Sequence, residues 1–156
     1  MKIRILMVCL GNICRSPLAE GILQSKLNRS QFFVDSAGTG AWHSGQQPDK
    51  RSIQIATKYG IDISTQRARQ FLAQDFDTFD YIYVMDSSNY KNVISLAPTT
   101  LAKSKVKLIM NELFENENLE VPDPYYGMED GFETIYKMLD EVCDVIADKL
   151  HKTHLS

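Results

Sequence analysis

Eight consecutive residues near the start of the chain, Cys9 to Ser16, bring together a thiol, a glycine, an arginine and a serine. They follow an apolar run and precede a helical pattern, so they are interpreted as a loop between a strand and a helix. Within the loop, Gly11 and Asn12 tolerate the left-handed backbone that a tight turn needs. The amides of such a loop and the N-terminus of the helix hold an anion well, and Arg15 can grip two phosphate oxygens.

The same positive surroundings stabilise the thiolate form of Cys9, which is the form that attacks phosphorus. Ser16 is placed to donate its hydroxyl to that sulfur and to help it leave later. Judged alone, a cysteine at a strand end is more often an inert buried thiol. A Cys-x5-Arg spacing is also weak by itself, because chance puts an arginine at a given offset about once in twenty. The strand–loop–helix setting favours the nucleophile.

Strands and helices are expected to alternate along the rest of the chain. Strands are expected at residues 2–8, 32–36, 80–85 and 106–110, helices at 17–28, 48–59, 87–97 and 132–150, and irregular segments at 66–79 and 111–126. Ser16 is expected to cap the first helix, with Pro17 at its first position. The alternation predicts an α/β fold with a four-stranded parallel sheet and helices on both faces. Ligands of such sheets bind at the carboxyl ends of the strands, where Cys9, Ser36 and Asp86 fall.

Composition and charge limit the class of protein. The chain has 156 residues, of which 44% are hydrophobic and 24% charged, and this predicts one globular domain over residues 1–156. The net charge of −3, without a basic cluster, argues against a nucleic-acid or membrane partner. The first apolar run is too short for a signal peptide, and no stretch approaches the ~18 residues of a membrane span. With three cysteines, these features predict a cytoplasmic, reducing location.

The complete octet, Cys-Leu-Gly-Asn-Ile-Cys-Arg-Ser, resembles the signature loop of the low-molecular-weight protein tyrosine phosphatases. The resemblance covers essentially the whole chain, and its further motifs lie at residues 35–39, 79–82, 85–86 and 121–127. It implies a flavodoxin-like, three-layer fold of the phosphotyrosine protein phosphatase I type. It also implies hydrolysis of phosphotyrosine in a protein substrate by a monomer or a weakly self-associating chain. Because a thiolate and an arginine perform this chemistry, neither a metal nor another cofactor is expected.

The resemblance also implies roles for individual residues. Cys9 is expected to take the phosphoryl group as a cysteinyl-phosphate, and Arg15 to bind that group and stabilise the transition state. Asp123 is expected to protonate the leaving phenolate and then to activate water. Asn12 and Ser36 are each expected to brace the loop by hydrogen bonding. The remaining phosphate-binding residues are expected to be Leu10, Gly11, Asn12, Ile13, Cys14 and Ser16.

Several positions around the loop concern specificity and support. Trp42, Tyr125 and Tyr126 are expected to form aromatic walls around a phenyl phosphate. Gln66 stands where the family often has a histidine that bonds the loop asparagine. Glutamine can still donate a hydrogen bond, but it does not titrate. The resemblance therefore does not secure this part of the brace. Asp86 matches a family aspartate near the site and equally suits a helix cap, so its role stays open.

Cys14 has two interpretations. It is either a small hydrophobic residue under the loop or a resolving thiol that traps oxidised Cys9 as a reversible disulfide, and the resemblance supports the second. Cys143, on the final helix, is expected to be a packing residue.

Other functions are compatible with parts of this pattern. A thiol-dependent arsenate reductase would need further cysteines, and Cys143 has no partner in a redox loop. A protein-arginine phosphatase is expected to have threonine where this chain has Ile13, so isoleucine favours phosphotyrosine. A phosphotyrosine-binding module without activity would be expected to lack the nucleophile or the acid. A zinc site has too few ligands.

Overall fold

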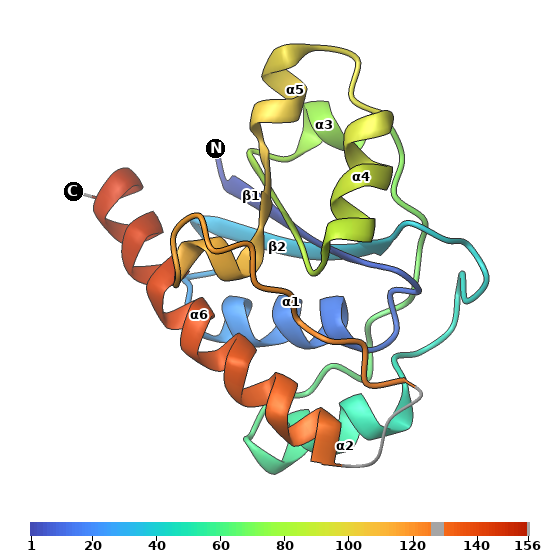
Figure 1. The fold of residues 1–156 in the computed structure, drawn as a ribbon. Helices are drawn as coiled ribbons and strands as arrows, with labels where there is room; N and C mark the ends of the chain where they lie inside the picture. Colours follow the sequence, from blue (N-terminus) through green and yellow to red (C-terminus); the bar gives the residue numbers. More distant parts are fainter. Residues whose placement is uncertain (126–129, 156) are drawn as a thin grey trace.

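The computed structural model describes residues 1–125 and 130–155, and it shows a parallel β-sheet between two layers of helices (Figure 1). In chain order the elements are β1 (Ile3–Cys9), α1 (Arg15–Ser25), β2 (Phe32–Gly38), α2 (Lys50–Lys58), α3 (Asp75–Thr78), β3 (Tyr81–Val84), α4 (Ser87–Ser95), α5 (Thr100–Ser104), β4 (Val106–Leu108), the 3-10 helix η1 (Ile109–Glu112) and α6 (Asp130–His154). The strand order is β2-β1-β3-β4, and each neighbouring pair is parallel. The predicted four-stranded parallel sheet with helices on both faces is confirmed.

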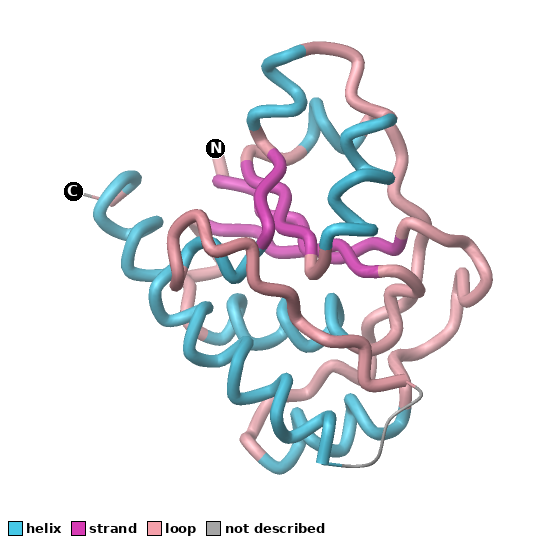
Figure 2. Tube along the Cα trace, viewed as in Figure 1, coloured by secondary structure: helices cyan, strands magenta, loops and turns pink. Residues whose placement is uncertain are grey.

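The alternation of side chains along β1 builds a separate core on each face of the sheet. Ile5 and Met7 join the core beneath α1, α2 and α6, whereas Leu6 and Val8 join the core beneath α3, α4 and α5. All four side chains are fully buried, as expected for a central strand that is covered on both faces. The loops that follow β1 and β2 therefore lie together at one end of the sheet (Figure 2).

The long final helix, α6, closes the first layer. Its buried stripe, which includes Ile135, Leu139, Val142 and Ile146, packs against α1, as its helical periodicity predicts. Its outer faces carry charged residues. In the described part of the chain, no helix combines the length and the apolar character that crossing a membrane requires.

Several local expectations were wrong: α1 ends at Ser25 and not at residue 28, and α6 runs from Asp130 to His154 and not over residues 132–150. Helix α1 begins at Arg15, so Ser16 is not its cap, and the hydroxyl bonds inside the site instead. Strand β4 ends at Leu108 and continues as η1, two residues before the predicted end of the strand. The short helix α5 was not predicted, although Thr99 supplies a capping signal for it by accepting a hydrogen bond of 3.0 Å from the Ala102 amide.

Candidate active site

Neighbouring segments bond several carbonyl oxygens of the loop between β1 and α1. Those of Cys9 and Leu10 each accept a hydrogen bond of 2.9 Å from amides of the loop after β2, and that of Ile13 accepts one of 2.8 Å from Asp49. Within the described residues, the amides of residues 11–14 make no hydrogen bond. Consecutive unbonded amides at the start of a helix are the arrangement that binds anions in proteins.

Cys9 lies at the carboxyl end of β1, and its side chain is buried. Its Sγ is 3.0 Å from Oγ of Ser16, which in turn accepts a hydrogen bond of 2.8 Å from Nδ2 of Asn12. Because that bond uses Ser16 as an acceptor, the serine retains its own proton for the sulfur. The other acceptor within reach, the Ala37 carbonyl, is more distant at 3.5 Å. The arrangement suits a hydroxyl that donates to a thiolate.

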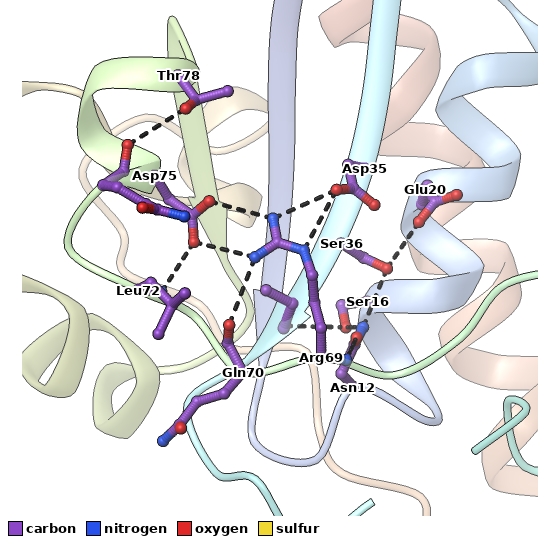
Figure 3. Close-up of polar contacts among 12 residues, drawn as sticks. Asn12, Ser16, Glu20, Asp35, Ser36, Arg69, Gln70, Leu72, Asp75 and Thr78 are labelled. Atoms are coloured by element: carbon purple, nitrogen blue, oxygen red, sulfur yellow. Dashed lines mark hydrogen bonds and ion pairs between the residues drawn. The ribbon is translucent and has the colours of Figure 1, made fainter. Parts of the chain in front are cut away.

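Asn12 is the centre of the network behind the loop (Figure 3). Its backbone φ of 58° lies in the left-handed region, which asparagine tolerates better than most residues. Besides its bond to Ser16, Nδ2 donates to Oγ of Ser36 over 3.0 Å, and Oδ1 accepts from the backbone amide of Arg69 over 2.9 Å. The side-chain amide thus has three partners, and Asn12 and Ser36, both expected to support the loop, bond to each other.

Gln66 does not contact the loop asparagine. Its Nε2 donates to the carbonyl of Pro17 over 3.1 Å, so it holds the first turn of α1 instead. The bond to the asparagine comes from the Arg69 backbone, and the Arg69 side chain is held by two acidic residues (Figure 3). Its guanidinium bonds Asp75 over 3.1 and 3.2 Å and Asp35 over 3.3 Å. The sequence left this part of the brace open, and the structure assigns it to the Arg69 backbone.

Glu20, which the sequence did not indicate, extends the network one turn along α1. Oγ of Ser36 donates to its carboxyl group over 2.7 Å (Figure 3). Burial raises the pKa of Glu20 to about 7, with Asp35 contributing, although the Ser36 hydrogen bond and the nearby arginines Arg29 and Arg69 act in the opposite direction. The i to i+4 spacing from Ser16 on the same helix was the available signal.

Arg15 is a buried cation with fixed partners. Its Nη1 donates to Oδ2 of Asp86 over 2.6 Å and to the carbonyl of Val121 over 3.0 Å. Oδ1 of Asp86 accepts from the Asn89 amide over 2.8 Å and caps α4. Both interpretations of Asp86 therefore hold together: one carboxylate oxygen caps a helix and the other orients the arginine.

Asp123 lies on the opposite side of the same arginine. Its Oδ2 is 3.6 Å from Nη2 of Arg15, and its Oδ1 accepts a hydrogen bond of 3.0 Å from the Tyr125 amide. Burial disfavours the charge on Arg15, but Cys9, Asp86 and Asp123 together outweigh it and raise the pKa of the guanidinium. The site thus keeps a permanent cation between a thiol and a carboxyl group.

These side chains surround one cavity of about 400 Å³. Its lining consists of Cys9, Leu10, Gly11, Ile13, Cys14, Arg15, Trp42, His43, Asp123 and Tyr125. All of these except His43 belong to the predicted site, while Asn12, Ser16, Ser36 and Asp86 support the loop from behind. A larger cavity of about 720 Å³ lies beside β4, but no cysteine or arginine lines it among the described residues.

The mouth of the cavity is aromatic. Trp42 is 70% exposed and Tyr125 is 37% exposed, and both line the opening as expected. The His43 ring lies 6.3 Å from that of Tyr125, and it is so close to the loop that a Cβ added at Gly11 would be 3.1 Å from its Cδ2. In the sequence, the only indication that His43 lines the cavity was its position next to Trp42. Tyr126 lies outside the described residues.

The second cysteine of the loop, Cys14, is also a buried thiol. Its burial raises the pKa of the thiol, with Asp49, Cys9 and Asp123 adding to the effect. Cys9, Cys14 and Cys143 are all free thiols. The two loop cysteines line the same cavity, whereas Cys143 is enclosed in the core beneath α6.

Comparisons with known proteins agree over sequence and fold. The family model for low molecular weight phosphotyrosine protein phosphatase matches residues 4–155. The chain is 43% identical to low molecular weight phosphotyrosine protein phosphatase 1 of Drosophila melanogaster over 147 residues, which cover 90% of this chain and 92% of the relative. It is 36% identical to a human low molecular weight phosphotyrosine protein phosphatase, covering 94% and 95% of the two chains. A crystal structure of a protein tyrosine phosphatase from Entamoeba histolytica superposes with a TM-score of 0.90 at 35% identity, covering 97% and 99%.

Proposed function

We propose a residue-level mechanism for this chain, which belongs to the low molecular weight phosphotyrosine protein phosphatase family and is a protein-tyrosine phosphatase. Its substrate is a phosphoprotein, and its reaction is hydrolysis of a tyrosine phosphate ester. The observation that carries the assignment of roles is the convergence of Cys9, Arg15 and Asp123 on one cavity from segments far apart in the sequence.

In the first step, the Cys9 thiolate attacks phosphorus and forms an S–P bond while the P–O bond to tyrosine breaks. Asp123 gives its proton to the departing phenolate oxygen, so tyrosine leaves as a neutral hydroxyl. Arg15 and the amides of residues 11–14 hold the phosphoryl oxygens, whose charge they stabilise in the transition state. Nη1 of Arg15 is anchored by Asp86 and Val121, which leaves the remainder of the guanidinium fork for the substrate.

In the second step, Asp123 acts as a base. Its carboxylate takes a proton from water, the water oxygen attacks phosphorus, and the S–P bond breaks to release phosphate and the Cys9 thiolate. Ser16 stabilises the departing sulfur through its hydroxyl, which lies 3.0 Å away and is oriented by Asn12. Ile13 lines the cavity beside the aromatic mouth, and we propose phosphotyrosine rather than phosphoarginine as the substrate.

Hydrolysis of para-nitrophenyl phosphate and of a phosphotyrosine peptide tests this mechanism. We expect Cys9→Ser to abolish turnover and the wild type to yield a phosphoryl group on Cys9 when the reaction is quenched and analysed by mass spectrometry. Cys143→Ser is the matched control, because it removes a thiol that does not line the cavity. A chelator is expected to leave the rate unchanged. Turnover by Cys9→Ser, or phosphate on another residue, would disprove the role of Cys9.

We also propose that Cys14 protects Cys9 from irreversible oxidation. Peroxide converts the Cys9 thiolate to a sulfenic acid, and the Cys14 thiol then condenses with it, losing water and forming a disulfide that an external thiol reduces. Burial raises the pKa of Cys14, which keeps this thiol protonated and disfavours its own reaction with peroxide. We expect activity to return fully with a thiol reductant in the wild type and less fully in Cys14→Ser. Equal recovery in both would count against the protective role.

We place the reaction in the cytoplasm, because a reducing compartment preserves free thiols such as the three cysteines of this chain. We also propose that residues 1–156 act as one domain and as a monomer or weakly self-associating chain. The mechanism proposed above uses Cys9, Arg15 and Asp123, which line one cavity of a single chain, and it therefore calls for no residue of a second copy. The net charge of −3 supports neither a nucleic-acid nor a membrane partner.

A further inference from the structure

Arg51, in the first turn of α2, links three segments that surround the cavity. Its Nε and Nη2 each bond the Asp49 carboxylate over 3.0 Å. Asp49 caps α2, and its backbone amide donates to the carbonyl of Ile13 over 2.8 Å. The guanidinium is therefore fixed in relation to the phosphate loop.

The same guanidinium reaches the segment that carries Asp123. Its Nη2 donates to the backbone carbonyl of Tyr125 over 3.0 Å, and its central carbon lies 5.7 Å from the Tyr125 ring centroid. It also lies 4.6 Å from the ring centroid of Phe132 on α6. The planar guanidinium is oriented by its bidentate ion pair with Asp49 and by the two aromatic rings. A lysine ammonium at this position would be held less precisely.

Tyr125 passes this constraint on to the acid. Its amide donates to Oδ1 of Asp123 over 3.0 Å, and its carbonyl accepts from Arg51. The two groups belong to one residue, so displacement of the Tyr125 backbone displaces the hydrogen-bond donor that orients the carboxyl group. This orientation is needed because the Asp123 side chain is 34% exposed, unlike the buried Arg15.

We propose that Arg51 is a positioning residue for proton transfer, which holds Asp123 at the phosphate loop through the Tyr125 backbone. The inference rests on the proposed role of Asp123 as the general acid. Arg51 does not line the described cavity, and its effect is therefore expected on the acid and not on phosphate binding.

Leaving-group dependence tests the proposal. A phenolate from phenyl phosphate resembles that of tyrosine, with a pKa of about 10, and needs protonation to leave. A 2,4-dinitrophenolate is a far weaker base and leaves without help. We expect Arg51→Met to lower kcat/KM about tenfold for phenyl phosphate and less than twofold for 2,4-dinitrophenyl phosphate. Arg51→Lys keeps the charge but not the planar fork, so its kcat/KM for phenyl phosphate is expected to lie between those of the wild type and Arg51→Met.

Lys58→Met is the matched control. Lys58 lies on the same helix and pairs with Glu133 of α6 over 2.6 Å, so its loss removes a link between α2 and α6 without touching residues 123–125. We expect its ratio of the two kcat/KM values to equal that of the wild type. Because both substrates are measured on the same preparation, this ratio does not depend on the fraction of folded enzyme.

A double-mutant cycle separates this inference from the proposed mechanism. If Arg51 acts through Asp123, Arg51→Met is expected to cause no further loss with phenyl phosphate in the Asp123→Asn background. Two outcomes would overturn the role of Arg51 and leave the assignment of Asp123 intact. One is an equal loss of kcat/KM for both substrates in Arg51→Met, and the other is a full loss from Arg51→Met in the Asp123→Asn background. If Asp123→Asn itself shows no leaving-group dependence, the general-acid assignment fails, and the inference about Arg51 fails with it.

Discussion

The phosphate loop and the segment carrying Asp123 face each other across one cavity, but different kinds of contact hold them. The side chains of Asn12, Arg15 and Ser16 are at most 2% exposed, and the network behind the loop meets most of their polar groups. Asp123 is 34% exposed, and its partners are one backbone amide, that of Tyr125, and Arg15 at 3.6 Å. The proposed phosphate-binding residues thus belong to a buried, continuous hydrogen-bond network, whereas the proposed acid is held by a few individual contacts at an exposed position.

The difference follows from what each region must do. The phosphoryl group meets the same atoms in both steps, so a rigid cradle lowers the cost of reorganisation. The acid must admit a tyrosine side chain from a protein surface and then a water molecule, so it lies at the open side of the cavity. Substitutions in the buried region should therefore affect all substrates equally, and those in the exposed region should distinguish between them.

The largest effect is expected from Arg15→Lys, in the buried region. An ammonium cannot replace the planar fork that Asp86 and Val121 anchor, so kcat/KM should fall by about 10³-fold, irrespective of the leaving group. Steady-state kinetics with phenyl and 2,4-dinitrophenyl phosphate measures this. Arg67→Lys, at an exposed arginine whose bonds are local, is the control. A loss that depends on the leaving group would contradict the comparison.

Asn12→Ala should rank next. It removes three hydrogen bonds and leaves alanine at a φ of 58°, so we expect kcat to fall about 10- to 100-fold and the free energy of unfolding to fall by about 3 kcal/mol. Denaturant titration and kinetics measure the two effects. Asn116→Ala is the matched control, since Asn116 has a φ of 64° but is exposed and distant from the cavity. It should lose some stability and no activity; similar activity losses in both variants would refute the role given to the network.

Glu20→Gln should change stability in a pH-dependent way. The pKa of Glu20 is raised to about 7 by burial, so the folded protein binds an extra proton between the unfolded pKa of about 4.5 and pH 7. The contribution of Glu20 to the free energy of unfolding is therefore fully present below about pH 4.5 and is lost as the pH rises through about 7. Glutamine can still accept the hydrogen bond from Ser36, but it has no charge to bury. At pH 8 the free energy of unfolding of the variant should therefore exceed that of the wild type by roughly 1 to 3 kcal/mol.

Denaturant titrations at pH 5 and pH 8 measure this change. Glu133→Gln is the contrasting control, because the hydrogen bond and ion pair with Lys58 lower the pKa of Glu133, and its substitution should destabilise the protein above that pKa. If the stability of Glu20→Gln relative to the wild type is the same at both pH values, Glu20 is not a buried titrating group.

The smallest effect is expected from Trp42→Ala, at the exposed mouth. Its side chain is 70% exposed, so stability should change little, whereas aryl phosphates should lose a stacking surface. We expect kcat/KM to fall about threefold more for phenyl phosphate than for a small alkyl phosphate. Equal losses for both substrates would show that Trp42 does not select aryl groups, and would blur the contrast between the two regions.

Local sequence signals predicted the phosphate loop well, because its residues are contiguous and the strand before it and the helix after it have clear patterns. They were less reliable where a neighbour decided the outcome. The Ser16 hydroxyl was predicted both to cap α1 and to donate to Cys9; it lies 3.0 Å from the Cys9 sulfur but does not cap the helix. Gln66 was compared with a family histidine, yet the bond to Asn12 comes from the Arg69 backbone, which no side-chain motif reveals.

The sequence by itself predicted the alternation of strands and helices, with Cys9 as the nucleophile and Arg15 as the phosphate-binding residue. Through resemblance, it also predicted Asp123 as the acid. Only the tertiary structure decided how Asp123 meets Arg15 and which residues hold it there. The order β2-β1-β3-β4 places the end of β3 beside the end of β1, and Val121 donates to the Met85 carbonyl over 2.9 Å just beyond that end. Contacts between segments so distant in the chain arise from strand order and packing, which no local pattern of residues encodes.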